Sequence, residues 1–567
     1  MPGGPLHSVP RQESIPGMVS RSAGLRPGAA ALTEIRGDGT LLAVDYGTLH
    51  EDMRAVAGGL LRGGRGRPVA GIVGRNSVAW CRAYLGVLSA GGIAVPMDRE
   101  IPFLEMYSIL ERSGANTVFF DGTAAEGFAG KAADRCPGLR RVSLDGVTTD
   151  GGIETLDALA DSPGVPASRG PTDVSGPAVI CYTSGTTGRS KGVVLSQANL
   201  LSDIRQMFQF IRMDEEDVFL SVLPFHHTYE CTCGFLGPLS LGASVFICRG
   251  LRYVLDDLGT SRATIILGVP LLWEAVYGRV MDGIRDLPGG KVMLAAGMLL
   301  SGAADLIGAR GVRKRLFHRV HEKFGGRLRL MISGGAAVDP AVVRGFERLG
   351  FCFLQGYGLT ETSPIVAVNR IGANRYGSVG PPLPEVEVRI LDPDADGTGE
   401  ITVRGPNVML GYHEDPEATA AVLSEDGWFR TGDFGHLDGD GYLFVTGRKK
   451  NVIVAKNGKN VYPEEIETLL NRSPLVAESM VFGRQSLRKG EEIWAVAVPD
   501  TDALSGSDPV EAVRGVIRKY NSQTPSYRRI SGFLVREEEL PRTTTRKIRR
   551  RDVFPGGEPP DTDVHRP

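Results

Sequence analysis

Cysteine is scarce in this chain, and its distribution argues against two kinds of protein. Seven cysteines occur among 567 residues, an odd number, and most of them lie inside apolar runs. Cys231 and Cys233 are the only close pair, and no second Cys or His pair stands at the spacing of a zinc site. The sequence therefore predicts reduced thiols in a cytoplasmic protein, with no disulfide framework and no zinc finger.

Long hydrophobic runs and an excess of one charge are also missing. Residues 263–273 and 292–300 are apolar, but both contain Gly or Pro, and both are shorter than the roughly 18 residues that cross a bilayer. Lys and Arg total 64, Asp and Glu total 66, and the formal net charge is -2. No field of the whole molecule draws it to nucleic acid or an anionic membrane. We expect a soluble protein with at most peripheral membrane association and no nucleic-acid partner.

One stretch is unusually rich in glycine and hydroxyl groups. Residues 182–192 read YTSGTTGRSKG and follow an apolar run at 177–182. Glycines let backbone N–H groups approach phosphate oxygens, Ser and Thr hydroxyls donate further hydrogen bonds, and a lysine adds positive charge. The spacing differs from the common P-loop, in which Gly, four residues, Gly and Lys precede Ser or Thr. The stretch predicts a polyphosphate cradle. If this motif is considered without the rest of the chain, a flexible surface loop is the alternative.

Helix and strand patterns alternate through the first part of the chain. Residues 48–62 and 76–90 have helical spacing, whereas 69–73 and 91–96 have the character of short apolar strands. Such alternation favours parallel strands joined by crossover helices. Beyond the cradle, Ser196 is the predicted N-cap of a helix that ends at Phe210.

The pattern changes in the last third of the chain. Short alternating strands at 386–390 and 400–404 predict a β-rich subdomain. A strand at 493–498, a helix at 509–520 and a strand at 532–535 then predict a small α+β domain. The fold class is therefore α/β: a large N-terminal domain of αβ subdomains plus a β-rich subdomain, followed by a small C-terminal domain. The predicted division is a disordered leader over 1–30, the N-terminal domain over 31–446, the C-terminal domain over 447–554 and a disordered tail over 555–567.

Small and polar residues follow two of the predicted strands. Gly334 and Gly335 follow the strand at 328–333, and Thr360 and Glu361 lie in the loop after the strand at 351–354. Open α/β sheets bind ligands at the carboxyl ends of their strands, so both loops are expected to meet one ligand. A hydroxyl beside a carboxylate suits a magnesium ion that bridges phosphate oxygens.

The histidines give weaker signals. His226 and His227 are adjacent and lie among aromatic residues, which usually means packing, although one of them is a candidate for lining a pocket. His318 and His321 lie in a basic helical segment, and their spacing is not that of the zinc-protease motif. We expect these two on a solvated helix face.

Six basic residues crowd the stretch 541–551 near the C-terminus. The stretch has three interpretations: a solvated tail, a patch for nucleic acid or anionic lipid, or the carrier of one functional lysine. Aromatic residues for base stacking are absent there, which disfavours nucleic acid.

Five motifs stand in an order and spacing that resemble the adenylate-forming (AMP-binding) superfamily: YTSGTTGRSKG, QGYGLTETS, WFRTGD, GRKKNVIV and PRTTTRKI. The resemblance spans about residues 45–552. LPFHHTYE and GRKKNVIVAKNGKNVYPEEIE are most similar to long-chain fatty acid CoA ligases. The resemblance implies two half-reactions: a carboxylate attacks the α-phosphate of ATP with release of pyrophosphate, and a thiol then displaces AMP.

The resemblance also implies roles for individual residues. Lys547 matches the catalytic lysine, although Arg546 precedes it where many members have Gly, which leaves the local loop geometry open. Lys450 matches the hinge about which a mobile C-terminal domain turns between the two half-reactions. Other matched residues hold pyrophosphate (Thr183, Ser184, Gly185, Thr186, Thr187, Gly188 and Lys191), contact phosphate and Mg²⁺ (Thr360, Glu361 and, for the metal, Thr187), flank adenine (Gly335, Ala336, Tyr357 and Gly358) or bind ribose (Asp433 and Arg448).

The expected substrates are ATP with Mg²⁺, a medium- or long-chain fatty acid, and coenzyme A. Gly334 is small enough to leave a path past the adenine site, and an apolar tunnel would be walled by Phe225, His226, His227 and Phe235. The alternative is that the glycines only permit a tight turn. Aryl acids, a carrier-protein phosphopantetheine as the thiol, and a non-catalytic nucleotide-binding protein are the rival interpretations; intact Lys191, Glu361, Asp433 and Lys547 argue against the last.

Overall fold

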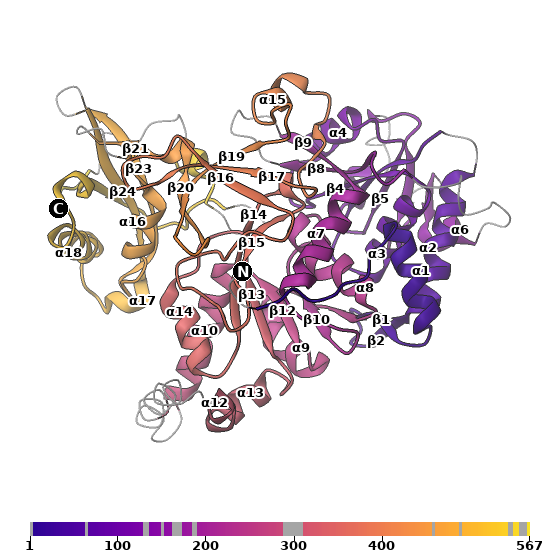
Figure 1. Ribbon diagram of the computed structural model, residues 1–567, viewed down its shortest axis with the longest axis horizontal. Coiled ribbons are helices and arrows are strands. Elements are labelled where there is room, and N and C mark those ends of the chain that lie inside the picture. Colours follow the sequence, from indigo (N-terminus) through magenta and orange to yellow (C-terminus); the bar gives the residue numbers. More distant parts are fainter. Residues whose placement is uncertain are drawn as a thin grey trace. The chain divides into compact units, whose positions relative to one another are not determined.

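The structure is a computed structural model of the chain, and its elements are labelled in Figure 1. It describes residues 4–62, 66–128, 135–148, 152–161, 173–183, 190–286, 297, 310–455, 460–486, 490–542, 548–554 and 564–567. The chain forms two compact units, Met1–Glu387 with Val403–Phe429, and Val388–Thr402 with Arg430–Pro567. The predicted α/β class, with a large N-terminal part and a smaller C-terminal part, is confirmed.

The large unit is built on two eight-stranded sheets whose central strands are parallel. The first sheet contains, in spatial order, β15 (Ile365–Val368), β14 (Phe353–Gly358), β13 (Leu330–Ser333), β12 (Ile265–Gly268), β10 (Val218–Ser221), β11 (Ser244–Ile247), β1 (Ala30–Ile35) and β2 (Leu41–Asp45). The second contains β18 (Gly411–Tyr412), β9 (Lys191–Ser196), β8 (Pro177–Thr183), β4 (Ile93–Met97), β3 (Val69–Val73), β5 (Thr117–Phe120), β6 (Arg140–Ser143) and β7 (Ile153–Thr155).

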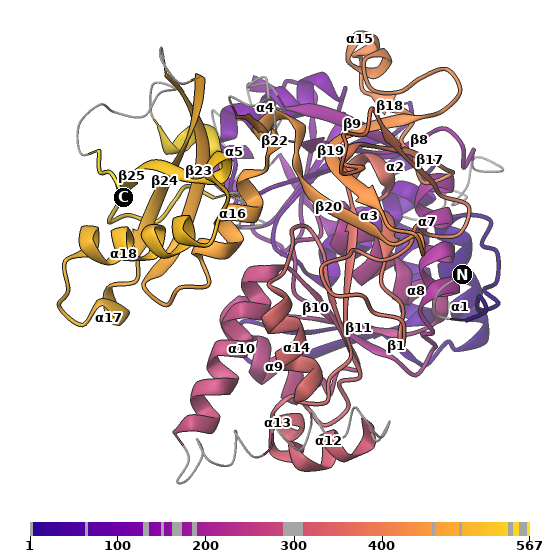
Figure 2. The ribbon, with the colours of Figure 1, turned by 60° about the vertical axis from the view of Figure 1, so that its left-hand side comes forward.

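Helices cover both sheets. In chain order they are α1 (Ile15–Leu25), α2 (Tyr46–Leu61), α3 (Val78–Ser89), α4 (Phe103–Arg112), α5 (Ala125–Phe128), α6 (Leu156–Ala160), α7 (Gln197–Phe210), α8 (Gly237–Leu241), α9 (Val254–Ser261), α10 (Pro270–Arg285), α12 (Arg310–Leu316), α13 (His318–Lys323), α14 (Pro340–Arg348) and α15 (Pro416–Ala420). Helix α3 contacts β3 and β4 of the second sheet and β1 of the first, so it lies between the two sheets. Figure 2 shows α10 and α14 side by side, where Tyr277 packs against Phe346.

Most of the sequence predictions for these elements are confirmed to within two residues at each end, but the strand predicted at 351–354 is β14, which continues to Gly358. The helices predicted at 48–62 and 76–90 are α2 and α3, and the strand predicted at 69–73 is β3. Ser196 caps α7 as predicted: its hydroxyl accepts from the N–H of Asn199 at 3.0 Å, and the Asn199 side chain accepts from the N–H of Ser196 at 2.9 Å. This reciprocal pair fixes where the chain leaves β9.

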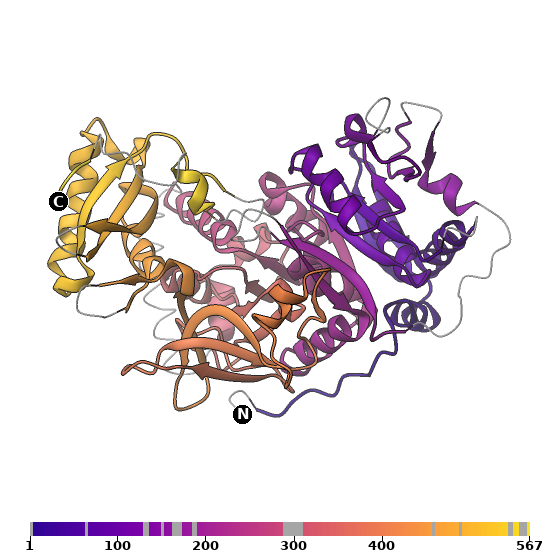
Figure 3. The ribbon, with the colours of Figure 1, turned by 90° about the horizontal axis from the view of Figure 1, so that it is seen from above.

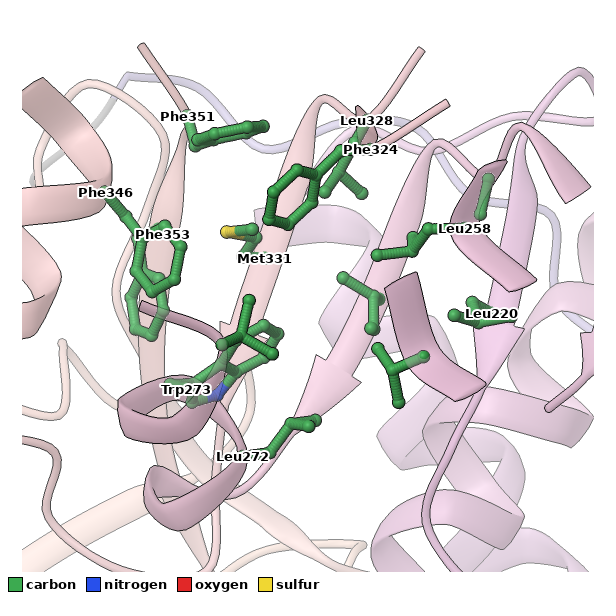
Figure 4. Packing of buried hydrophobic residues seen from close by; sticks show 14 of the residues in the cluster. Leu220, Leu258, Leu272, Trp273, Phe324, Leu328, Met331, Phe346, Phe351 and Phe353 are labelled. Carbon is green, nitrogen blue, oxygen red and sulfur yellow. The ribbon is translucent and has the colours of Figure 1, made fainter. Parts of the chain in front are cut away.

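The core of the first sheet is largely aromatic. Trp273 from α10 packs on Phe346 from α14 and on Phe353 from β14, with ring centroids 6.2 and 5.3 Å apart. Figure 4 shows these rings around Met331, whose side chain is fully buried. A separate apolar cluster lies between the second sheet and helix α4.

The amino-terminal segment differs from the predicted disordered leader. Helix α1 forms within residues 1–30 and buries Ile15, Met18 and Val19 completely. Ahead of it the chain runs extended over the large unit (Figure 3), and the N–H of His7 donates to the carbonyl of Gln209 at 2.9 Å. The buried Arg370 donates to the carbonyls of Gly4 and Pro5 at 2.8 and 3.0 Å. Pro and Gly in the segment suggested disorder, but a short apolar stripe and these carbonyl contacts order it.

The second unit begins with most of a four-stranded sheet and ends with an α+β domain. The strands of this four-stranded sheet are β16 (Glu387–Leu391), β17 (Gly399–Arg404), β19 (Phe429–Leu437) and β20 (Leu443–Arg448). The remaining elements are β21 (Ile453–Val454), β22 (Asn460–Val461), α16 (Pro463–Leu470), β23 (Val476–Ser486), β24 (Gly490–Pro499), α17 (Thr501–Leu504), α18 (Pro509–Ser522) and β25 (Ile530–Val535). The predicted strand at 493–498 and helix at 509–520 are thus confirmed as parts of β24 and α18.

Two smaller predictions are wrong. His321 is buried rather than solvated: its Nε2 lies 2.9 Å from the Leu349 carbonyl and its ring stacks on Phe351. Residues 564–567 were predicted in a disordered tail, yet the backbone of His565 pairs with Phe533. The basic stretch was left with three interpretations; within it, Arg550 binds the buried Glu467 at 2.6 Å and Arg542 binds Glu478, so these two guanidinium groups have structural partners.

The seven cysteines all lie in the described ranges, and none of them forms a disulfide. Within the described residues, no helix combines the length and the apolar character that a bilayer crossing requires.

Candidate active site

The predicted phosphate cradle connects two antiparallel strands. Strand β8 ends at Thr183 and β9 begins at Lys191, and these two residues face each other in the register. The hydroxyl of Thr183 donates to the carbonyl of Lys191 at 3.5 Å. The predicted pyrophosphate residues Ser184, Gly185, Thr186, Thr187 and Gly188 lie outside the described residues, and so does the metal role assigned to Thr187.

A hydrogen-bonded frame positions Glu361. It lies in the one-turn helix η4 (Thr360–Thr362) between β14 and β15, and its carbonyl accepts from the N–H of Met409 at 2.8 Å. The side chain of Asn407 donates to the carbonyls of Thr362 and Ile365 at 3.1 and 2.7 Å. The Asn199 side chain on α7 donates to the carbonyl of Val408 at 2.9 Å. The helix after the cradle and the loop before β18 are therefore tied to the turn that carries Glu361.

Tyr412 brings two of the predicted residues together. Its hydroxyl donates to the Glu361 carboxylate at 3.0 Å, and the Nζ of Lys191 lies 4.7 Å from the centre of its ring. Strand β18, which carries Tyr412, pairs with β9 just beyond Lys191. A lysine and a carboxylate from distant parts of the sequence thus share one aromatic side chain at the base of the cradle.

The Tyr412 hydroxyl is protonated at neutral pH and can therefore donate a hydrogen bond. Burial raises the pKa of Tyr412, and the negative charge of Glu361 raises it further. A protonated phenol next to an ionised carboxylate makes a charge-assisted hydrogen bond, which fixes the direction of the carboxylate.

Replacing Tyr412 by Phe is expected to lower kcat/KM for MgATP roughly 10-fold, because a hydrogen bond to a charged group contributes about 1.5–3 kcal/mol. The ring, and with it the contact to Lys191, is retained. Steady-state pyrophosphate release against MgATP concentration measures the effect. Tyr412→Leu removes both contacts and should cost more; equal activity of wild type and both variants would contradict the role.

The residues predicted to flank adenine lie at the carboxyl ends of two neighbouring parallel strands. Gly335 follows β13 with a φ of +85°, a conformation that favours glycine. Ala336 is exposed, while Tyr357 and Gly358 end β14 and are half-buried. The structure therefore brings the two predicted loops to one edge of the sheet, as expected from the strand order.

The space beside Gly334 is occupied rather than open. A Cβ added there would lie 2.9 Å from the ring of Tyr229, and the Tyr229 hydroxyl donates to the Ile332 carbonyl at 3.2 Å. The expected path past Gly334 is therefore closed by an aromatic ring in this conformation. Glycine is needed because the ring lies directly against it.

The residues predicted to line an acyl tunnel divide into two environments. Phe225 and Phe235 are fully buried and pack with Trp80 and Tyr84 in one aromatic cluster. His226 lies 3.8 Å from the Asp98 carboxylate, and its ring packs at a tilt against that of His227, with the ring centroids 4.2 Å apart. Burial lowers the pKa of His226 to about 3, with a contribution from Arg99, so the ring is neutral and its contact with Asp98 is no ion pair at neutral pH.

Glu230 begins the π-helix η2 (Glu230–Leu236), directly after Tyr229. The side chain is fully buried, and burial raises the pKa of Glu230 to about 8, against the opposing effect of the Ser221 hydroxyl and the backbone of Leu223 and Val222. π-helical turns occur often at functional sites. The carboxyl group is therefore held protonated at neutral pH beside the predicted tunnel residues.

Replacing Glu230 by Gln should raise stability increasingly as the pH rises. In the folded chain the pKa is about 8 instead of 4.5, so the wild type loses stability progressively above pH 4.5 until the pH passes about 8. Gln mimics the protonated form throughout. Thermal unfolding from pH 5.5 to 8.5, with exposed Glu215→Gln as the control, should show a midpoint difference that grows with pH; a constant or opposite difference would refute it.

Asp433 and Arg448, the predicted ribose-binding pair, belong to the second unit. They face each other on β19 and β20, and the Nε of Arg448 lies 3.1 Å from the Asp433 carboxylate. Asp433 is almost fully buried, and its N–H donates to the Thr431 hydroxyl at 3.1 Å. The ion pair orients the carboxylate, which could accept from a diol.

The predicted hinge and catalytic lysines also belong to the second unit. Lys450 lies in a short turn, Lys449–Asn451, directly after β20. Desolvation lowers the pKa of Lys450, and the positive charges of Arg448, Arg551 and Arg550 lower it further. Lys547 lies outside the described residues.

The donors around Glu361 suit a magnesium ion held mainly by phosphate. No group of three or more His, Cys, Asp or Glu side chains placed to hold a metal occurs among the described residues. Mg²⁺ typically keeps several waters and binds one or two carboxylates together with substrate phosphates. A half-buried carboxylate with a neighbouring hydroxyl, as at Glu361 and Thr360, fits that mode.

Sequence reasoning missed Tyr412, Tyr229 and Glu230. Tyr412 lies in the short strand β18, and nothing in the local sequence Gly411-Tyr412-His413 marks it. Tyr229 and Glu230 stand inside the stretch singled out for its histidines, so a buried carboxyl in an apolar run was a signal that could have found Glu230.

Two family models match the chain. Residues 19–413 match the model described as AMP-binding enzyme. Residues 450–554 match the model described as AMP-binding enzyme C-terminal domain.

Individual relatives cover most of the chain. The indoleacetate–CoA ligase of Aromatoleum aromaticum is 31% identical over 550 residues, which are 94% of this chain and 96% of the relative. A chloroplastic long-chain-fatty-acid–(acyl-carrier-protein) ligase of Arabidopsis thaliana is 29% identical over 549 residues, covering 82% of this chain and 74% of the relative. The structure of ATP-bound MatB from Rhodopseudomonas palustris aligns with a TM-score of 0.75 and 27% identity, over 94% of this chain and 97% of that one.

Proposed function

Because the chain belongs to the AMP-binding enzyme family, we propose that it activates an apolar carboxylic acid with ATP and transfers the acyl group to coenzyme A. The products of the first half-reaction are an acyl-adenylate and pyrophosphate. Those of the second are the acyl-CoA thioester and AMP.

The observation that carries the proposal is the meeting of Lys191, Glu361 and Tyr412 at the base of the predicted cradle. A phosphate-binding cation and a metal-binding carboxylate must act on one polyphosphate, and the shared tyrosine keeps them at a fixed separation. Pre-organised charges of this kind stabilise a charge-separating transition state because no reorganisation is needed during the reaction.

The proposed division of labour follows from the chemistry. Lys191, with Thr183, Ser184, Gly185, Thr186, Thr187 and Gly188, holds the pyrophosphate leaving group. Thr360 and Glu361 hold Mg²⁺, which neutralises phosphate charge when bound. Gly335, Ala336, Tyr357 and Gly358 flank adenine, Asp433 and Arg448 bind ribose, and Lys547 faces the carboxylate attacking the α-phosphate.

A medium- or long-chain fatty acid is the first proposed substrate. Relatives named for long-chain fatty acids support it, and so does the apolar cluster of Phe225 and Phe235. The thiol is proposed to be coenzyme A. A carrier-protein phosphopantetheine is the alternative acceptor, which the acyl-carrier-protein ligase relative supports.

An arylacetic acid is the second proposed substrate class. Two observations favour it: the indoleacetate ligase is similar over nearly its whole length, and Tyr229 closes the path beside Gly334 with an aromatic wall. A flat ring fits a short aromatic-lined space better than a long alkyl chain does.

The experiment is a panel of acids assayed for acid-dependent ATP/pyrophosphate exchange. The panel contains fatty acids of increasing length, indoleacetate, benzoate derivatives and amino acids. The active acid is then offered coenzyme A and phosphopantetheinylated carrier protein in parallel. If none of the acids in the panel supported ATP/pyrophosphate exchange, the proposed function would be refuted. Tyr229→Ala tests the substrate class: if the Tyr229 ring closes the acid-binding space, the variant should accept longer chains than the wild type.

A further inference from the structure

We propose that Arg112 is a positioning residue that fixes both ends of the predicted phosphate cradle and thereby sets Lys191 against Glu361. The inference rests on the proposed function for its catalytic meaning, but its structural part is testable without any substrate. Arg112 is the last residue of α4 and lies far from the cradle in sequence. None of the five family motifs contains it.

The guanidinium group of Arg112 contacts both sides of the cradle. Its Nη2 donates to the carbonyl of Ser190 at 2.8 Å, immediately before Lys191. Its Cζ lies 4.6 Å from the centre of the Tyr182 ring, which stands at the other end of the cradle on β8. A planar cation can donate in its plane and stack with its face at the same time, which a lysine ammonium cannot do.

The backbone of Arg112 is engaged as well. The Nε2 of His413 lies 3.0 Å from the Arg112 carbonyl, so the imidazole donates to it. The N–H of His413 in turn donates to the Gly192 carbonyl at 2.7 Å. Arg112 is thus linked to the strand that carries Tyr412 as well as to the strand that carries Lys191.

Gly192 shows how closely these parts fit. A Cβ at this position would lie 3.1 Å from the Tyr182 ring, 3.1 Å from the His413 side chain and 2.9 Å from Ile180. Strand β18 continues the same sheet, with Tyr412 opposite Val193. The end of α4, both ends of the cradle and β18 therefore form one packed unit, and Arg112 contacts three of its parts.

Fixing the ends of the cradle should lower the entropic cost of binding ATP. A cradle whose ends are fixed before ATP arrives loses less conformational entropy on binding than one whose ends must be ordered by the ligand. A hydrogen bond to a charged donor contributes about 1.5–3 kcal/mol, which corresponds to about 10–100-fold in an equilibrium. Replacing Arg112 should therefore raise the KM for MgATP and leave the KM for the acid unchanged.

The matched control is Arg67. It also donates to two backbone carbonyls, that of Gly91 at 2.8 Å and that of Pro177 at 2.5 Å, and Pro177 is the first residue of β8. Arg67→Met removes the same chemistry from the opposite end of the same strand. A general loss of sheet stability would be shared by both variants, whereas a positioning effect would be confined to Arg112→Met.

The decisive measurement is amide hydrogen exchange of the ligand-free full chain, read at residues 190–192. Arg112→Met should raise exchange there by about 10-fold or more, and Arg67→Met should leave it unchanged. Equal exchange in wild type and Arg112→Met would overturn the proposal, whatever the protein catalyses.

The kinetic measurement uses the acid found active in the panel. Arg112→Met should raise the KM for MgATP by about 10-fold or more, with a smaller change in kcat and none in the KM for the acid, and Arg112→Lys should recover part of the loss. Equal shifts of both KM values would overturn the positioning role. If no acid supports exchange in the wild type, the proposed function fails, while the hydrogen-exchange result still decides the role of Arg112.

Discussion

Replacing Lys547 by Ala is expected to reduce acid-dependent ATP/pyrophosphate exchange by about 100- to 1000-fold, the usual cost of removing one donor aimed at developing charge. Adenylation brings an anionic carboxylate against an anionic phosphate, so a positioned cation has its largest effect in that step. Thioester formation starts from a mixed anhydride that is already activated. The variant should therefore still convert supplied acyl-adenylate to the thioester.

Two assays on one preparation test this expectation: exchange from ATP and acid, and thioester formation from synthetic acyl-adenylate. Arg549→Ala is the matched control, since Arg549 is an exposed cation in the same basic stretch. The control should retain both activities. An equal loss of both half-reactions in Lys547→Ala would show that the residue supports the fold and not adenylation.

The second large effect is expected at Glu361. Glu361→Gln keeps the size of the side chain and a potential acceptor for the Tyr412 hydroxyl, but removes the charge. If the carboxylate holds Mg²⁺ on the phosphates, exchange should fall by about 100-fold or more, and the Mg²⁺ concentration that gives half-maximal rate should rise. Exchange measured over a magnesium titration at fixed ATP gives both values.

Asn407 supplies the control for this prediction. Asn407→Ala disturbs the frame that carries the turn of Glu361 and leaves the carboxylate in place. It should lower the unfolding temperature and the rate without changing the magnesium requirement. A Glu361→Gln enzyme with an unchanged magnesium requirement would refute the metal role, even if its rate were low.

The sequence predicted the elements well where local signals were complete. The cap at Ser196 and the helix to Phe210 were predicted to the residue, because a capping side chain and helical spacing lie within one turn of each other. The two loops after β13 and β14 were also placed correctly, because parallel strands bring their carboxyl ends to one edge. Both are short-range or topological arguments.

Other features depend on contacts between segments that are distant in sequence. Tyr412 and Arg112 have no local signal, since each gains its role from residues more than 40 positions away. Gly334 was expected to leave a path, but the ring of Tyr229 fills that space. His321 was expected in solvent because its helix is basic, but its imidazole ring stacks on Phe351 and lies within hydrogen-bond distance of the Leu349 carbonyl. Spacing along one chain segment cannot reveal what packs against it.

The predicted boundary between the domains remains a prediction, and so do the hinge role of Lys450 and the mobility of the C-terminal domain. The compact second unit includes residues 388–402 and begins again at 430, earlier than the boundary predicted at 446. The reason is that β17 pairs with β19. Part of the β-rich subdomain therefore forms one sheet with the strands that follow it in the chain.

The extended segment before α1 affects how samples of this protein should be compared. The carbonyls of Gly4 and Pro5 accept from a guanidinium group that is 98% shielded from water, since Arg370 is only 2% exposed. Amino-terminal trimming during storage would remove these acceptors and leave the cation without two of its contacts. Loss of the first residues thus removes hydrogen bonds from a buried side chain. The intact mass should therefore be checked before the activities of two preparations are compared.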